Sequence, residues 1–190
     1  MNDDIEILRL LLGKKEENFT IRKIAEALKI NYRTAYEKTA LLEKENLIKM
    51  TRIGNSKICE LTQKFNSKTY EAEYLRREAL FKNKDFLVLH NRLAELEFGF
   101  IALIFGSYAK ETATKHSDID LLTIGGDEKR IRSVVSLLPD KIHLTAISYA
   151  SFLEMVKTGK FTVVSEAIKN NIILLGAEEY YRMLSNADRQ

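Results

Sequence analysis

The chain has 190 residues, of which 45% are hydrophobic and 30% charged, and its formal net charge is +3. This composition predicts a soluble globular protein with one medium domain or two small ones. No apolar run approaches the roughly 20 residues of a membrane span, and the acidic start at residues 1–4 lacks signal-peptide character. We therefore expect a cytoplasmic protein with no membrane partner.

Three amphipathic helices are predicted in the first 45 residues. Apolar residues recur at helical spacing over residues 3–12 before Gly13, and Thr20 is the predicted N-cap of a second helix that runs to Leu28. Asn31 is the predicted N-cap of a third helix over residues 32–45. The predicted apolar face of this third helix consists of Ala35, Tyr36, Thr39 and Leu42.

A β-hairpin is predicted to follow these helices. Residues 48–53 and 56–61 alternate between polar and apolar side chains around Gly54-Asn55, which suits a two-residue turn. The order helix, helix, helix, hairpin resembles the winged helix-turn-helix DNA-binding domains over residues 1–64. Cys59, the single cysteine, is predicted to be packed in this domain rather than reactive.

The resemblance implies double-stranded DNA as a partner of residues 1–64. This stretch holds thirteen Lys or Arg against ten Asp or Glu, whereas the two signs balance over the rest of the chain. The alternative is a winged helix that docks a protein. The predicted phosphate contacts are Arg33, Lys38, Lys49, Arg52 and Lys57. The residues predicted nearer to base edges are Asn31, Tyr32 and Thr34.

A long helix is predicted over residues 63–83, because this stretch has no proline or glycine. We assign residues 65–84 as a linker helix whose aromatic side chains pack two domains together or serve a homodimer. A further amphipathic helix at residues 85–96 begins the second domain, residues 85–190.

The most informative stretch of the chain begins with the apolar run of residues 100–105. A run that stops at Gly106-Ser107 predicts a buried strand entering a tight turn, with free backbone N–H groups at the start of a short helix. A second strand is predicted over residues 117–124, which places Asp118 and Asp120 on one face. Two such carboxylates predict a site for Mg²⁺ or Mn²⁺ shared with substrate phosphates.

This stretch resembles the DNA polymerase β-type nucleotidyltransferases, particularly the minimal members with the pattern Gly-Ser-x-Ala-Arg-Gly, then Ser-Asp-x-Asp-Leu. Lys110 replaces the arginine of the pattern, and Glu111 departs from its glycine. The resemblance implies a nucleoside triphosphate as substrate, with Asp118 and Asp120 as catalytic metal ligands. The residues that it implies for nucleotide binding are Gly106, Ser107, Lys110 and Ser117.

The remaining elements extend the resemblance over about the last hundred residues. We predict an α/β domain with helices on one side of a small mixed sheet. The predicted elements are a helix at residues 127–138 ended by Pro139, a strand at 141–148, helices at 149–157 and 161–170, a strand at 172–175 and a helix from Ala177.

The third strand departs from the family pattern. Active members carry a third carboxylate on this strand, which completes the metal site and can accept the proton of the attacking hydroxyl. Here the corresponding position is His143. A neutral imidazole could act as the base or bind a metal, although it prefers softer ions than Mg²⁺, or the histidine could simply fill the position. Asp140, three residues earlier, is a poorer substitute.

The leading hypothesis is a nucleotidyltransferase that moves a nucleoside monophosphate to an acceptor and is fused to a DNA-binding winged helix. The first alternative is a transcriptional regulator whose impaired transferase domain senses nucleotide or docks a partner. The second is an antitoxin-type nucleotidyltransferase that acts on a partner protein or toxin.

Overall fold

The computed structural model describes residues 2–138, 141–158 and 163–187. The chain divides into two compact units, residues 1–75 and 76–190, and the boundary falls inside a helix. Pro139 and Asp140, and the predicted helix start at Phe161, lie outside the described residues. No helix among the described residues is long and apolar enough to cross a membrane.

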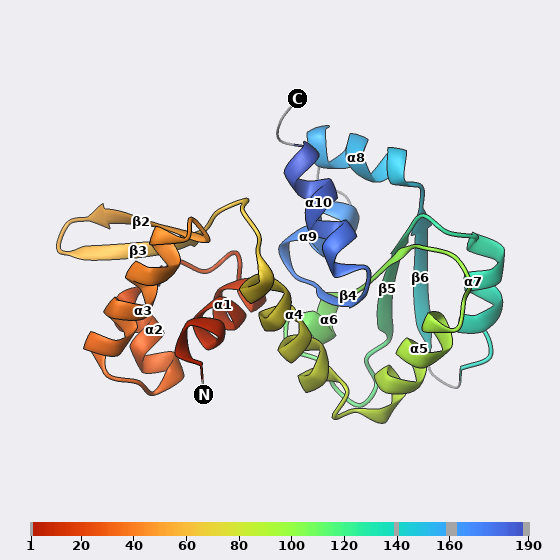
Figure 1. Cartoon of the computed structure of the whole chain (residues 1–190). Helices are drawn as coiled ribbons and strands as arrows, with labels where there is room; N and C mark the ends of the chain where they lie inside the picture. Colours follow the sequence, from red (N-terminus) through yellow and green to blue (C-terminus); the bar gives the residue numbers. More distant parts are fainter. Residues whose placement is uncertain (1, 139–140, 159–162, 188–190) are drawn as a thin grey trace. The chain divides into compact units, whose positions relative to one another are not determined.

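The first unit combines helices with a small antiparallel sheet (Figure 1). The sheet has the strand order β1-β3-β2, so the short first strand pairs with the second strand of the predicted hairpin. The elements are α1 (Asp3–Gly13), β1 (Phe19–Thr20), α2 (Ile21–Leu28), α3 (Tyr32–Lys44), β2 (Ile48–Ile53), β3 (Ser56–Leu61) and the first turns of α4 (Ser67–Leu80).

Both predicted helix caps of this unit are confirmed. The Thr20 hydroxyl accepts a hydrogen bond from the backbone N–H of Lys23 at 3.2 Å, and the Asn31 side chain accepts one from Thr34 at 2.8 Å. These bonds satisfy N–H groups that have no partner within the helix. Cys59 is 2% exposed, and burial raises the pKa of its thiol to about 11, so this residue is packed as predicted.

Two features of the first unit differ from the prediction. The helix expected over residues 63–83 is the shorter α4, because the Asn66 side chain accepts a hydrogen bond from the N–H of Lys68 and starts the helix there. Tyr36 does not belong to the apolar face of α3, since it is 41% exposed and its hydroxyl accepts a hydrogen bond from Lys57 at 3.4 Å.

The second unit is an α/β structure around a four-stranded mixed sheet of order β6-β5-β4-β7. Strands β5 and β6 are parallel, and the other two pairs are antiparallel. The elements are the end of α4, then α5 (Lys84–Ala94), β4 (Ile101–Phe105), α6 (Gly106–Ala109), β5 (Ile119–Ile124), α7 (Glu128–Val135), β6 (Ile142–Ile147), α8 (Tyr149–Thr158), α9 (Val163–Lys169), β7 (Ile172–Leu175) and α10 (Ala177–Ala187).

Helices cover both faces of this sheet, so the prediction of helices on one side was wrong. Helices α5 and α7 pack Phe86, Leu89 and Ile131 against Ala102 and Ile104 of β4. The alternate β4 side chains are also fully buried, on the face where α9 and α10 contact this strand (Figure 1). An apolar run without polar alternation is typical of a strand buried on both faces.

Candidate functional site

The candidate site begins at the turn between β4 and α6. Gly106 has a φ of +67°, and the chain then forms the single helical turn Gly106–Ala109. The backbone N–H of Lys110 donates to the Gly106 carbonyl at 3.1 Å. Glu111, which replaces the glycine of the family pattern, adopts a φ of 57°. Glu111 therefore adopts the left-handed backbone conformation that ordinarily favours glycine.

Three of the predicted site residues meet beside this turn. Asp120 on β5 pairs with Phe105 of β4 on one side and with His143 of β6 on the other. Asp118 lies just before β5, two residues from Asp120. The His143 ring places Nε2 at 3.5 Å from Asp118 Oδ2 and Nδ1 at 3.8 Å from Asp120 Oδ1. The sheet therefore brings together Asp118, Asp120 and His143.

The two aspartates differ in their electrostatic surroundings. The Lys141 ammonium donates a hydrogen bond to Asp118 Oδ2 at 2.8 Å, and this bond lowers the pKa of Asp118 below its ordinary value. Partial burial raises the pKa of Asp120, and the negative charges of Glu166 and Asp118 raise it further, against the opposing effect of His143. A cation between the carboxylates would relieve this repulsion.

Two charged residues that the motif did not predict also belong to the site. Lys141 lies immediately before β6, and its carbonyl accepts the N–H of Ile119, which sets it opposite Asp118. Glu166 on α9 places Oε1 at 2.7 Å from the Nζ of Lys110. The parallel register of β5 and β6 could have indicated Lys141, but no local pattern links Glu166 to residues more than forty positions earlier.

The predicted nucleotide-binding residues belong to the turn after β4 and to the loop before β5. Gly106 lies against Asp120, and Ser107 is half-buried, with its carbonyl accepting the N–H of Thr112 at 2.9 Å. The Ser117 hydroxyl accepts the N–H of Thr114 at 2.8 Å, so this side chain shapes the loop before Asp118. Lys110 is exposed and forms the ion pair with Glu166 described above.

The donor set fits one hard divalent cation. Mg²⁺ and Mn²⁺ prefer oxygen ligands, and Mg²⁺ takes one or two carboxylates together with waters and substrate phosphates. Asp118 and Asp120 supply such carboxylates, and the His143 ring reaches both of them. Within the described ranges, no three His, Cys, Asp or Glu side chains form a closed metal site.

The absence of a side chain at Gly106 leaves room for the Asp120 carboxylate. A Cβ atom on Gly106 would lie 2.2 Å from Asp120 Oδ2. We expect Gly106→Ala to displace this carboxylate and weaken Mn²⁺ binding by about tenfold or more, since Asp120 is half of the proposed ligand pair. The left-handed φ adds a stability loss of about 1–2 kcal/mol. Electron paramagnetic resonance of Mn²⁺ and denaturant unfolding measure the two effects.

Gly54→Ala is the matched control for this substitution. Gly54 has a φ of +59°, and no atom lies within 4 Å of the Cβ that would be added there. This variant should show a loss of stability and unchanged Mn²⁺ binding. Equal Mn²⁺ binding by both variants would contradict the proposed role of the Gly106 contact.

The residues predicted to contact DNA occupy several environments in the first unit. Tyr32 is 58% exposed, and Arg33 is exposed and pairs with Glu37 at 2.8 Å. The Asn31 side chain is engaged in the helix cap and Thr34 is half-buried, so neither points freely toward a base edge. Lys38 is half-buried, and its charge helps to lower the pKa of Asp4 on α1 after the larger effect of Lys68.

The hairpin supplies the remaining predicted DNA contacts. Lys57 of β3 lies over the Tyr36 ring of α3, with Nζ at 5.0 Å from the ring centroid. Lys49 is exposed, and exposed Arg52 donates from Nε to the Gly54 carbonyl at 3.1 Å. The structure therefore brings Lys57 to α3, whereas Arg52 lies at the tip of the hairpin.

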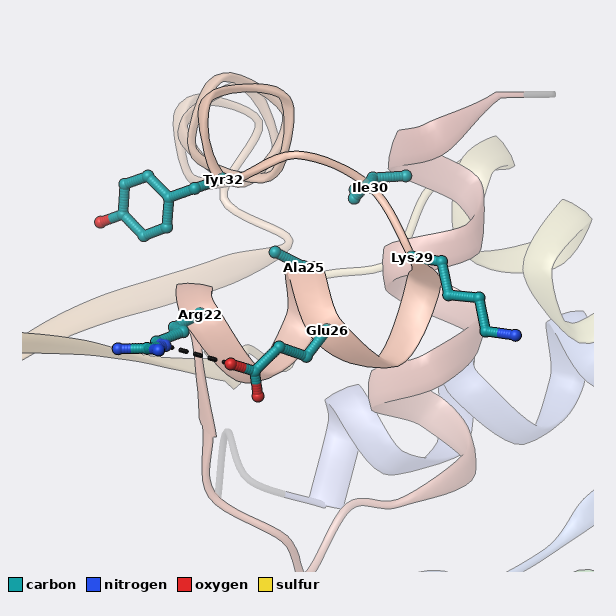
Figure 2. A pocket seen from close by; sticks show the side chains of 6 residues that line it. All are labelled: Arg22, Ala25, Glu26, Lys29, Ile30 and Tyr32. Atoms are coloured by element: carbon teal, nitrogen blue, oxygen red, sulfur yellow. Dashed lines mark hydrogen bonds and ion pairs between the residues drawn. The ribbon is translucent and has the colours of Figure 1, made fainter.

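A hollow of about 600 Å³ lies beside the start of α3 (Figure 2). Two basic side chains that are not among the predicted DNA contacts, Arg22 and Lys29, line this hollow. Arg22 pairs with Glu26 at 3.0 Å. The hollow is lined by Arg22, Ala25, Glu26, Lys29, Ile30 and Tyr32.

Comparison with known proteins identifies the second unit. A family model described as "Polymerase beta, Nucleotidyltransferase" matches residues 79–180, which is more than half of the chain. The matched range contains the Gly106 turn, both aspartates, His143 and Glu166, and it leaves α1 to β3 outside. No curated protein and no solved structure matches the chain.

Proposed function

Since the chain belongs to the polymerase β-type nucleotidyltransferase family, we propose that its second unit transfers a nucleoside monophosphate from a nucleoside triphosphate to an acceptor. The main structural support for this proposal is the position of the turn after β4. The paired strands β4 and β5 set the Gly106 turn directly against Asp120, with Asp118 two residues away. This proximity supports the proposal, because phosphoryl transfer needs phosphate-binding groups and metal ligands next to each other.

Each residue of the site has a role in this proposal. Ser107 and the backbone N–H groups that follow Gly106 hold the β- and γ-phosphates, and Lys110 offsets their charge. Asp118 and Asp120 would hold Mg²⁺ or Mn²⁺, which supplies charge stabilisation at the phosphates when bound. The half-exposed His143 ring faces both aspartates and is open to solvent, where an acceptor hydroxyl can reach it.

The proposed reaction is an in-line displacement at the α-phosphorus. The acceptor oxygen forms a bond to this phosphorus, the bond from phosphorus to the oxygen that leads to the β-phosphate breaks, and pyrophosphate leaves. The proton of the acceptor hydroxyl passes to a ring nitrogen of His143, which acts as the general base.

Titration calorimetry of the full chain with ATP, GTP, CTP and UTP, with and without Mg²⁺, tests this proposal. We expect at least one triphosphate to bind, with affinity that depends on Mg²⁺, because the carboxylates repel metal-free phosphates. A chain that binds none of the four in the presence of Mg²⁺ would contradict the proposed function.

A second candidate function is a regulator in which the transferase unit senses nucleotide without turning it over. The observation that favours it is the absence of a carboxylate at His143, together with the Lys141 ammonium on Asp118. Magnesium-dependent triphosphate binding without transfer of label to any acceptor would support this candidate over the enzyme.

For the first unit we propose a winged helix that binds double-stranded DNA. The order of α1 to β3 supports it, as do the exposed Tyr32 and Arg33 at the start of α3 and the basic hairpin. The hydrogen bond from Lys57 to Tyr36 links the hairpin to α3. The competing role, protein docking by the same surface, would leave duplex binding undetectable at low salt.

Replacing Arg33 and Arg52 together by alanine is expected to weaken duplex binding about tenfold and to lower the slope of log affinity against log salt by about 2, because two phosphate contacts are lost. Fluorescence anisotropy with a labelled duplex over a salt series measures both quantities. Wild-type protein that binds no duplex at low salt, or a double variant with unchanged binding, would refute the DNA role.

The control for this prediction is the pair Arg92→Ala and Arg132→Ala. These arginines lie in the second unit and are exposed in helical ion pairs with Glu95 and Glu128, as Arg33 is with Glu37. The control removes the same charge and should leave duplex binding close to wild type.

A further inference from the structure

The ion pair between Lys110 and Glu166 joins the phosphate turn to helix α9. Lys110 follows α6 directly, and its Nζ lies 2.7 Å from Glu166 Oε1, with side chains that are 42% and 37% exposed. The two residues are 56 positions apart. Helix α9 also contacts β4, the strand that leads into the turn. Glu166 is therefore held beside the residue proposed to bind phosphate.

Glu166 also acts electrostatically on the carboxylate pair. Its negative charge contributes, after burial, to the raised pKa of Asp120, so the Glu166 carboxylate lies within electrostatic range of the metal-binding residues. Glu166 thus adds a third negative charge to the site of Asp118 and Asp120. Lys141 pairs with Asp118, and Lys110 pairs with Glu166. The His143 ring lies beside Asp118 and Asp120.

This arrangement affects metal-free and metal-bound triphosphates differently. A metal-free triphosphate carries high negative charge, meets three carboxylates, and must compete with Glu166 for the ammonium of Lys110. A triphosphate that arrives with a divalent cation has much of this repulsion removed at Asp118 and Asp120. Lys110 can then exchange its bond to Glu166 for one to a phosphate oxygen.

We propose that Glu166 is a specificity-determining residue that makes the site select metal-bound over metal-free nucleoside triphosphate, through its negative charge and its ion pair with Lys110. This inference rests on the proposed function of the same site and assigns to α9 a role in substrate selection. Glu166 acts through Lys110 and through its own charge, and it takes no part in the transfer of the phosphoryl group.

Glu166→Gln tests the inference, because glutamine keeps the shape and a hydrogen-bond acceptor for Lys110 while it removes the charge. We expect the affinity of metal-free ATP, GTP, CTP and UTP, measured by calorimetry in excess chelator, to rise about fivefold, the size of effect expected for a half-exposed charge. The affinity of the same nucleotides with saturating Mg²⁺ should change less than about twofold, since the cation already offsets the carboxylate charge.

Two further variants control this experiment. Glu166→Asp keeps the charge and should retain the wild-type preference for metal-bound nucleotide. Glu128→Gln makes the same chemical change on α7, where Glu128 pairs with Arg132 at 2.8 Å on the opposite face of the sheet, and it should leave both affinities unchanged. Glu166→Ala provides a second neutral variant, and thermal unfolding of each variant verifies its folding.

The possible outcomes separate the inference from the proposed function. An unchanged ratio of metal-free to metal-bound affinity in both neutral Glu166 variants, with normal magnesium-dependent binding by wild type, would overturn the inference alone. A wild-type chain that binds no triphosphate with Mg²⁺ would overturn the proposed function and the inference with it. A tighter metal-free complex confined to the neutral Glu166 variants would support the inference.

Discussion

Replacement of Asp118 and Asp120 together by asparagine is expected to reduce magnesium-dependent triphosphate binding and any transfer activity by about 100-fold or more, because both charged metal ligands are lost. Asparagine keeps the shape of each side chain, so the fold should persist. The lost ion pair between Asp118 and Lys141 is partly exposed and screened by solvent, so its loss should change stability little. Removal of the repulsion between the two carboxylates acts in the opposite direction.

Calorimetry with and without Mg²⁺ measures this effect, and thermal unfolding verifies the fold. Asp85→Asn is a suitable control, since Asp85 is an exposed acid in the first turn of α5 and lies outside the proposed ligand pair. The control should bind nucleotide as wild type does. Magnesium-dependent binding of wild-type affinity by the double variant would show that Asp118 and Asp120 do not hold the cation.

Replacement of His143 by alanine is expected to lower transfer activity by about 10²-fold to 10⁴-fold, the range that a positioned general base supplies. Replacement of His143 by aspartate should instead raise turnover with Mg²⁺ above the wild-type rate, because it adds the third carboxylate at the β6 position that pairs with Asp120. Rates of nucleotide transfer under saturating Mg²⁺ measure both changes.

His90→Ala is the control for the His143 variants. His90 is on α5, where its ring packs 5.0 Å from that of Phe81, and its loss should leave turnover unchanged. Robust transfer by His143→Ala would contradict the assignment of His143 as base. That result would direct attention to another group, including Asp140, which lies outside the described residues.

Local patterns in the sequence predicted most elements of the fold. Side-chain caps at Thr20 and Asn31, the Gly54-Asn55 turn and the apolar runs of β4 and β5 depend on residues near in sequence, and the structure has these features where they were predicted. The covering of both sheet faces was missed, because it depends on α9 and α10 returning to β4 from the end of the chain.

The candidate site was predicted in part for the same reason. Asp118 and Asp120 occur in one short motif with Gly106, whereas Lys141 reaches Asp118 only through the parallel register of β5 and β6. Glu166 reaches Lys110 through the packing of α9. Ion pairs between distant segments have no local sequence pattern, so these partners could be found only in the folded structure.

The central claim is that the second unit transfers a nucleoside monophosphate, and incubation with α-labelled triphosphates tests it most directly. Wild-type chain, the Asp118→Asn and Asp120→Asn double variant and His143→Ala would each be incubated with Mg²⁺, cell extract and one labelled triphosphate at a time. The account predicts that label appears on protein or nucleic acid with wild type, falls sharply with His143→Ala and disappears with the double variant or with chelator. Labelling that persists undiminished in the double variant, or no labelling by wild type with any triphosphate, would contradict it.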